Sequence, residues 1–161
     1  MSSQRLIILA ARPSRSPVLG LRDYLSIPRR DHRAALIRLL ASDHPLAVEQ
    51  MRRRTPPVPR EWRVCRFCAQ RGSIEDEVHT LLRCPGAMLA EPRKRFSGQV
   101  LATRRDLRVS MAISPLSFLA EVVRDADTVG HLAELVHTVF VLCETVPMVV
   151  ITSEEQRLQL S

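Results

Sequence analysis

"VCRFCAQRGSIEDEVHTLLRCPG" (residues 64–86) holds three of the four cysteines of the chain and one of its five histidines. The candidate ligands fall in the order Cys65-x2-Cys68-x10-His79-x4-Cys84. Two cysteines separated by two residues can grip one ion from a tight turn, and a second pair further on completes the tetrahedral set of sulfur and nitrogen atoms that zinc accepts. The pattern therefore predicts a Zn²⁺ site of the CCHC type.

The second half of this stretch agrees with helix geometry. Ser73 is the predicted N-cap, and the acidic run 75–77 falls in or near the first turn, where the helix dipole favours negative charge. His79 and Cys84 are five residues apart, so on a regular helix they would point about 140° apart. Pro85 follows at once and indicates that the helix stops near residue 83, which frees Cys84 to turn back and close the site. Four protein ligands leave no open position, so the predicted role of the ion is structural.

Two other readings of the cysteines stay open. A dithiol redox pair at Cys65 and Cys68 requires a preceding strand, a following helix and a lowered thiol pKa. The sequence after Cys68 is instead typical of a loop, and this reading gives His79 and Cys84 no role. Simple burial of unliganded cysteines in an apolar core is the other alternative. Cys143 lies on the apolar face of the last predicted helix and is predicted to be a core residue.

The fold class predicted around this site is mainly α, a small helical domain organised around one structural zinc knuckle. The 161 residues suffice for one domain, and they are 45% hydrophobic but only 4% aromatic. Helices are predicted over 31–41, from Pro45 onward, over 87–107 with an interruption near Pro92, from Pro115 with Ser114 as N-cap, and over 129–144. The apolar stripe expected on the first helix is Ala35, Leu36, Leu39 and Leu40, and that on the last is Leu132, Leu135, Val136, Val139, Phe140 and Cys143. Residues 1–20 are predicted to be a flexible leader, 21–150 the helical domain with the knuckle at 65–84, and 151–161 a tail. The histidines outside the knuckle, His32, His44, His131 and His137, are predicted to lie on helix faces or in the core.

Charge is divided unevenly along the chain. Residues 1–108 carry 22 Arg or Lys against 10 Asp or Glu, whereas residues 109–161 carry 2 against 7. This asymmetry favours an anionic partner for the basic part, such as a nucleic acid. The predicted contacts are seven arginines with an aromatic residue among them: Arg52, Arg53, Arg54, Arg60, Arg63, Arg66, Arg71 and Trp62. Phe67 is expected to pack beside the metal instead, because it lies between the two knuckle cysteines.

Residues 33–86 resemble the zinc-binding segment near the C-terminus of non-LTR retrotransposon reverse transcriptases, including fragments widespread in fungal genomes. The matching features are an Arg- and Leu-rich helix, the "HPLAVE" corner, the Arg-containing stretch before the first cysteine, and C-x2-C followed by "EDEVHTLLRCP". The resemblance implies Cys65, Cys68, His79 and Cys84 as ligands and the surrounding arginines as contacts to RNA or DNA. Reverse transcription itself needs paired aspartates that hold two metal ions, and the chain has no adjacent Asp-Asp. We therefore expect no enzymatic activity.

The expected function is a non-catalytic, retroelement-derived zinc module that binds RNA or DNA. The alternatives are a protein-interaction or structural module, whose acidic C-terminal helices dock a partner or the basic half of the chain, and a relic without a selected role. No membrane association is expected, because the most apolar window (132–151) contains Glu134, His137 and Glu144. The location expected from the arginine clusters is intracellular and nuclear, with a mitochondrial one as the alternative because the first residues are Arg- and Ser-rich.

Overall fold

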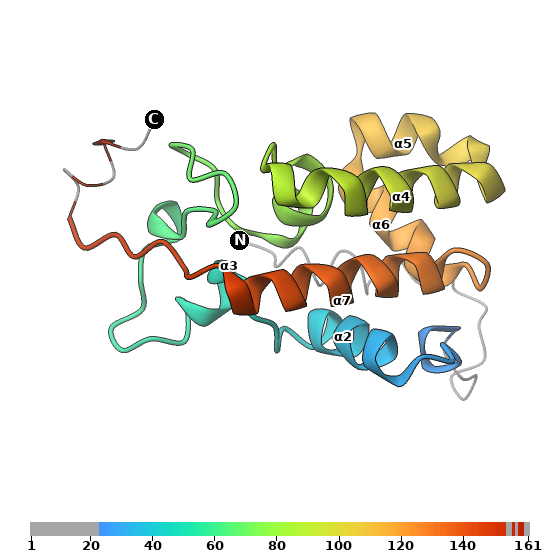
Figure 1. The fold of residues 1–161 in the computed structure, drawn as a ribbon, viewed down its shortest axis with the longest axis horizontal. Coiled ribbons are helices and arrows are strands. Elements are labelled where there is room, and N and C mark those ends of the chain that lie inside the picture. The colour runs from blue at the N-terminus through green and yellow to red at the C-terminus, as the bar shows by residue number, and fades with distance from the viewer. Residues whose placement is uncertain (1–22, 154–155, 157, 160–161) are drawn as a thin grey trace.

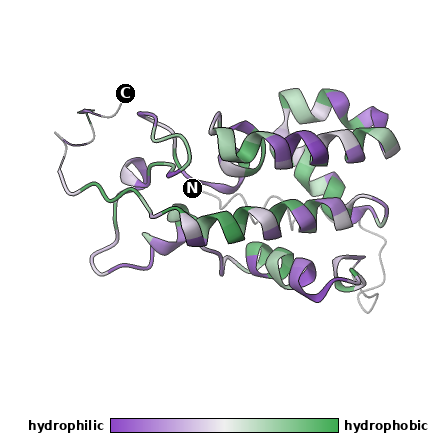
Figure 2. Ribbon diagram, in the orientation of Figure 1, coloured by the Kyte–Doolittle hydropathy of each residue, from purple (hydrophilic) through white to green (hydrophobic). Residues whose placement is uncertain are grey.

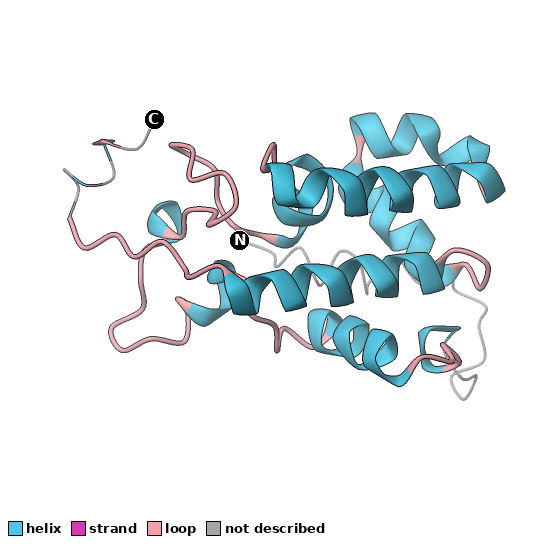
Figure 3. Ribbon diagram, in the orientation of Figure 1, coloured by secondary structure: helices cyan, strands magenta, loops and turns pink. Residues whose placement is uncertain are grey.

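The computed structural model describes residues 23–153, 156 and 158–159, and it is mainly α-helical, as predicted (Figure 1, Figure 3). The α-helices are α2 (Arg30–Leu40), α3 (Ala47–Gln50), α4 (Ala87–Thr103), α5 (Arg108–Ile113), α6 (Pro115–Arg124) and α7 (Val129–Thr145). Shorter helical turns are η1 (Asp23–Leu25), η2 (Arg60–Trp62), η4 (Arg105–Leu107) and the π-helical η3 (His79–Arg83). Within these described ranges there is no strand, only an isolated antiparallel bridge between Val64 and Ile74.

Helix α7 forms the centre of the molecule. It lies between α2 on one side and α4 on the other, and α6 packs against it after a change of chain direction of 116° (Figure 1). Helix α5 packs on α6. The long loop between α3 and the first cysteine, together with the segment that carries the cysteines, lies at one end of this arrangement.

The core forms because α7 buries a wide apolar stripe. Figure 2 shows that α7 is largely hydrophobic. Its six residues predicted to face inward are all buried: Leu132, Leu135, Val136, Val139, Phe140 and Cys143. The predicted stripe of the 31–41 helix is buried as well: Ala35, Leu36, Leu39 and Leu40. Phe96 of α4 and Phe118 of α6 meet edge to face, with ring centroids 6.0 Å apart. These contacts make one continuous cluster that extends to Cys65, Leu81 and Cys84.

The starts of α6 and α7 agree with the sequence prediction, and three other details differ. Helix α4 runs through Pro92 without the predicted interruption. Proline has no N–H, so the carbonyl of Met88, four residues earlier, lacks its helical donor. Met88 is 48% exposed, so water can solvate this turn. Helix α3 begins at Ala47, two residues after Pro45, and covers only four residues. Helix α5 was not predicted because it buries none of its residues and so has no apolar periodicity to detect.

The predicted leader, residues 1–20, lies outside the described residues, and the predicted tail is described only in part. Among the residues described, no single helix has both the length and the apolar character needed to cross a membrane; α6 and α7 meet those two criteria only as a sharply bent pair.

Candidate metal centre

The four predicted ligands meet in space. The ligand atoms of Cys65, Cys68, His79 and Cys84 all lie within 4.8 Å of one another. The two sulfur atoms of Cys65 and Cys84 are 3.6 Å apart, and Sγ of Cys68 is 3.5 Å from Nε2 of His79. Tetrahedral zinc with bonds of about 2.3 Å to sulfur and about 2.0–2.1 Å to nitrogen places its ligand atoms about 3.6–3.8 Å from one another. The cluster therefore has the size and the donor set of a metal site.

The first two ligands stand on a tight hairpin. The bridge between Val64 and Ile74 closes its base, and the amide of Cys65 donates to the carbonyl of Ser73 at 2.8 Å. The turn after the first cysteine is closed by the amide of Ala69, which donates to the carbonyl of Cys65 at 2.8 Å. Gly72, with φ of +79°, lets the chain reverse towards the bridge. This local geometry brings both sulfur atoms to one side of the hairpin.

The other two ligands come from the two ends of η3. The N-cap is Asp76, not Ser73 as predicted: Oδ1 of Asp76 accepts the amide of His79 at 2.9 Å. Ser73 is instead part of the hairpin, where its hydroxyl donates to the carbonyl of Gln70 at 2.5 Å. The prediction fails because Ile74 is held in the bridge, which delays the helix until residue 77.

The π-helical turn solves the spacing problem of His79 and Cys84. The amide of Cys84 donates to the carbonyl of His79 at 2.6 Å, a bond that spans five residues and widens the turn. The helix then ends at Arg83, as predicted from Pro85, and Cys84 has an extended conformation. The amide of Gly86 lies 3.4 Å from Sγ of Cys84 and donates to it. Both ligands therefore face the same point.

The sulfur atoms perturb one another strongly. The hydrogen bond from Cys65, together with the neighbouring His79, lowers the pKa of Cys84 to about 4. The same contact with Cys84, together with burial, raises the pKa of Cys65. Contact with Cys84 and Cys68 raises the pKa of His79. One thiolate is thus favoured by the protein alone, and a divalent cation would supply the charge that allows the other thiols to ionise.

Two arginines predicted to contact nucleic acid are instead buried beside the cluster. Arg66 is 9% exposed, and its guanidinium pairs with Glu75, which is fully buried, at 2.8 Å. Arg63 is also 9% exposed and donates to the carbonyls of Val48 and Val58. Burial and these internal hydrogen bonds argue against a contact with nucleic acid at both positions, because a count of charges cannot tell a solvated arginine from one whose donors are used inside the protein.

The Arg66 guanidinium ties the hairpin to two distant segments. It donates to the carbonyl of Pro45 at 2.8 Å and to those of Cys143 and Val146, at 3.0 and 3.1 Å, at the C-terminal end of α7. Carbonyls at the end of a helix lack intrahelical partners and attract cations, so Arg66 completes α7. All five N–H groups of the guanidinium have a partner once Glu75 is included.

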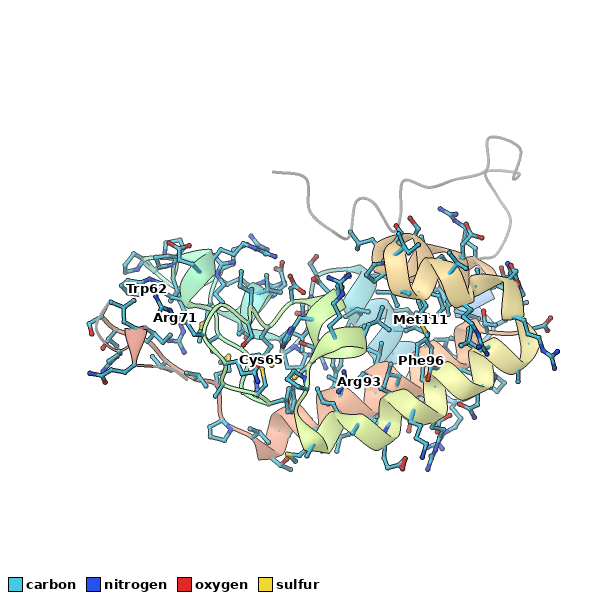
Figure 4. All side chains as sticks on the ribbon, turned by 90° about the horizontal axis from the view of Figure 1, so that it is seen from above. Trp62, Cys65, Arg71, Arg93, Phe96 and Met111 are labelled. Carbon is cyan, nitrogen blue, oxygen red and sulfur yellow. The ribbon has the colours of Figure 1, made fainter. Side chains whose placement is uncertain are left out.

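The other arginines predicted to contact nucleic acid differ in whether they already form ion pairs within the protein. Arg52 pairs with Glu49 at 2.6 Å, Arg60 with Asp76 at 2.8 Å, and Arg53 with Asp43 at 3.2 Å. Arg54 and Arg71 are exposed and have no ion pair among the described residues. Trp62 is half-buried and lies, like Arg71, at the end of the molecule that holds Cys65 (Figure 4).

The four histidines outside the knuckle lie in three places, of which one is the half-buried His131 on α7. His44 is fully buried, with Nε2 at 3.3 Å from Glu77, as expected for a core histidine. His32 and His137 approach each other beside Asp31, and the ligand atoms of these three residues also lie within 4.8 Å of one another. This second cluster was not predicted, because its residues lie on helices more than 100 positions apart and match no short sequence motif.

No family model, curated protein or solved structure matches the chain. The resemblance of residues 33–86 to retrotransposon reverse transcriptases thus stays a prediction that rests on the motif alone.

Proposed function

We propose that Cys65, Cys68, His79 and Cys84 hold one structural Zn²⁺ ion, in a non-catalytic, retroelement-derived module that binds RNA or DNA. The observation that carries the metal assignment is the pair of distances, 3.6 Å between two sulfur atoms and 3.5 Å from sulfur to imidazole, which are those of tetrahedral zinc ligands. Three sulfurs and one nitrogen suit zinc better than the oxygen-seeking cations. With four protein ligands, no position is left for water or a substrate.

The proposed nucleic-acid contacts are Arg54 and Arg71, with Trp62 as a stacking platform and the ion-paired arginines Arg52, Arg53 and Arg60 as further contacts. Arg54 and Arg71 are exposed without an ion-pair partner among the described residues, so they can contact phosphates without breaking an internal contact. Trp62 offers a face on which an unpaired base can stack. Such a surface predicts weak, salt-sensitive and largely sequence-independent binding to single strands.

A second candidate function is a protein-interaction or structural module. It is favoured by internal pairing of the acidic C-terminal helices with the basic part: Arg104 pairs with Asp125, and Arg95 lies 3.5 Å from Glu134. The two parts of unequal charge thereby belong to one body, which is the self-docking form of this alternative. A relic open reading frame is the third reading.

The first test is metal content. Protein purified without a tag should contain one equivalent of zinc, and a Cys65→Ser, Cys68→Ser variant should contain none, while Cys143→Ala should keep it. Absence of zinc from the parent protein would contradict the central assignment.

The second test is binding of a single-stranded RNA and of duplex DNA at two salt concentrations. Arg54→Ala, Arg71→Ala should weaken binding to the single strand and reduce the slope of log affinity against log salt by about 1.4, since each phosphate contact contributes about 0.7. Arg105→Ala, Arg108→Ala is the matched control, because both residues are exposed and lie near α5, away from the knuckle. Equal effects of the two double variants would favour the protein-interaction reading.

A further inference from the structure

A second group of metal-ligating side chains lies where α2 passes α7. Asp31 and His32 are in the first turn of α2, and His137 is in the middle of α7. Oδ2 of Asp31 is 3.6 Å from Nε2 of His137, and the rings of His32 and His137 are 5.1 Å apart between centroids. Figure 1 shows the two helices running alongside each other, and they are in direct contact.

The donor set of this group suits a borderline transition metal. Two imidazoles and one carboxylate are ligands that Zn²⁺, Co²⁺ and Ni²⁺ share, whereas the knuckle is dominated by thiols. With bonds of about 2.0–2.2 Å, ligand atoms in a tetrahedral shell lie about 3.3–3.6 Å apart. The contact between Asp31 and His137 already has this length, and the other ligand atoms, all within 4.8 Å of one another, need to close by at most about 1.5 Å. Asp31 is exposed and His137 is half-buried, so both side chains have room for this adjustment.

The surroundings fit an ion held by these residues. His32 is 9% exposed, and its ring lies against that of His137. Arg29 lies 3.0 Å from Asp31 and would compete with a metal ion for its carboxylate. The side chains of Asp31 and Arg29 are 44% and 67% exposed, and ion pairs this exposed contribute little to stability, so the ion can replace this contact. Glu134, one turn before His137, adds further negative charge near His32.

We propose that Asp31, His32 and His137 bind one divalent transition-metal ion of the zinc, cobalt and nickel class, in an exchangeable site that joins α2 to α7. Three protein ligands leave at least one position for water, so this site is open where the knuckle is closed. The ion bridges two helices that come together only in the folded chain, so it stabilises the fold by an amount that grows with the logarithm of its free concentration once this exceeds the dissociation constant. This proposal does not depend on the zinc knuckle or on nucleic-acid binding.

The test is a titration of tag-free, zinc-loaded protein with Co²⁺. We expect one further equivalent to bind, with visible d–d absorption but without the thiolate charge-transfer band that a cysteine ligand gives, and the melting temperature should rise with Co²⁺ concentration. His137→Ala should weaken this second binding by at least about tenfold, since even outer-shell partners have effects of that size. His131→Ala, on the same helix and also half-buried, is the control and should bind as the parent does.

Asp31→Asn is the second variant, because this exposed residue can lose its charge without disturbing the core. It should also weaken Co²⁺ binding, with an unchanged melting temperature in the absence of added metal. The proposal is overturned if no second equivalent binds, if the second equivalent shows a thiolate band, or if the His137 and His131 variants bind Co²⁺ equally well.

Discussion

The knuckle (residues 65–84) and the helical bundle (α2, α4, α6 and α7) are stabilised by different forces. The bundle is closed by fully buried apolar side chains such as Leu36 and Phe118, and such contacts depend mainly on volume. The knuckle has buried sulfur, a fully buried carboxylate at Glu75 and a buried guanidinium at Arg66. Its contacts depend on individual atoms and their charge. The bundle should therefore tolerate conservative changes that the knuckle does not.

Removal of the metal should have the largest effect, and it should act mainly on the knuckle. Binding of structural zinc supplies about 10–16 kcal/mol in small zinc-finger peptides at pH 7, and under the proposed assignment that free energy would hold the hairpin and η3 together. After treatment with a chelator, amide hydrogen exchange should accelerate over residues 64–84, while α7 keeps most of its protection. Equal loss of protection in α7 would show that the two regions unfold as one unit.

Glu75→Gln tests the charged part of the knuckle. The Glu75 carboxylate accepts hydrogen bonds from the amides of Ala47 and Arg66, both at 2.8 Å, and from the Arg66 guanidinium. The neutral amide leaves Arg66 as an unpaired buried charge, so urea unfolding should show a loss of about 3–5 kcal/mol. Glu91→Gln is the control, because Glu91 is 81% exposed and should change stability by less than about 0.5 kcal/mol.

Phe118→Ala tests the bundle. Phe118 is fully buried against Phe96, and its removal should cost about 3–5 kcal/mol of unfolding free energy. Because the knuckle ligands come from other elements, the zinc content should stay at that of the parent. Phe118→Leu should recover much of the loss, which would confirm that volume and not a specific contact is at stake. Loss of zinc from Phe118→Ala would instead mean that the bundle shapes the metal site.

Gly86→Ala probes the junction of the two regions. A Cβ at Gly86 would lie 2.6 Å from the carbonyl oxygen of Phe67, which is backbone of the knuckle turn and cannot move aside. We expect a cost of about 1–3 kcal/mol in thermal or urea unfolding. Gly98→Ala is a control of opposite sign: it lies inside α4 with open space around it, so it should stabilise by about 0.5–1 kcal/mol.

Asp125→Asn should have the smallest effect, and the effect should depend on pH. Burial alone would raise the pKa of Asp125, but the Arg104 guanidinium and the backbone amides that donate to this carboxylate hold its pKa below the ordinary value for aspartate. A carboxylate with a lowered pKa stabilises the fold above its unfolded pKa, and this contribution is lost as the pH falls through the folded value. The variant should therefore be less stable by about 1 kcal/mol or less at pH 7, and the difference should shrink as the pH falls through the folded pKa of Asp125 and vanish below it. A constant difference across this range would contradict the ion-pair explanation.

The sequence predicted the bundle and the ligands well, for related reasons. Apolar periodicity reports burial directly, so the inward faces of α2 and α7 were identified. The spacing of Cys65, Cys68, His79 and Cys84 is that required to surround one ion, so it identified four residues whose ligand atoms do lie together. The features that were not predicted are those that depend on contacts between residues distant in the sequence. Arg63 and Arg66 look like surface arginines because their acceptors, such as Val48 and Cys143, lie elsewhere in the chain. The Asp31 cluster went unseen for the same reason.

The set of bonds around Arg66 bears on whether the knuckle can be moved. The ligand pattern occupies a short and contiguous stretch, which suggests a unit that could be cut out or grafted into another protein. Yet Arg66 needs the carbonyls of Cys143 and Val146, and Glu75 needs the amide of Ala47. A peptide limited to residues 64–86 would expose this ion pair to water and lose its alignment. The four candidate ligands could therefore be transferred to another protein, but the ion pair that holds them here could not. A shortened chain that preserves the observed geometry must begin before α3 and continue beyond residue 146.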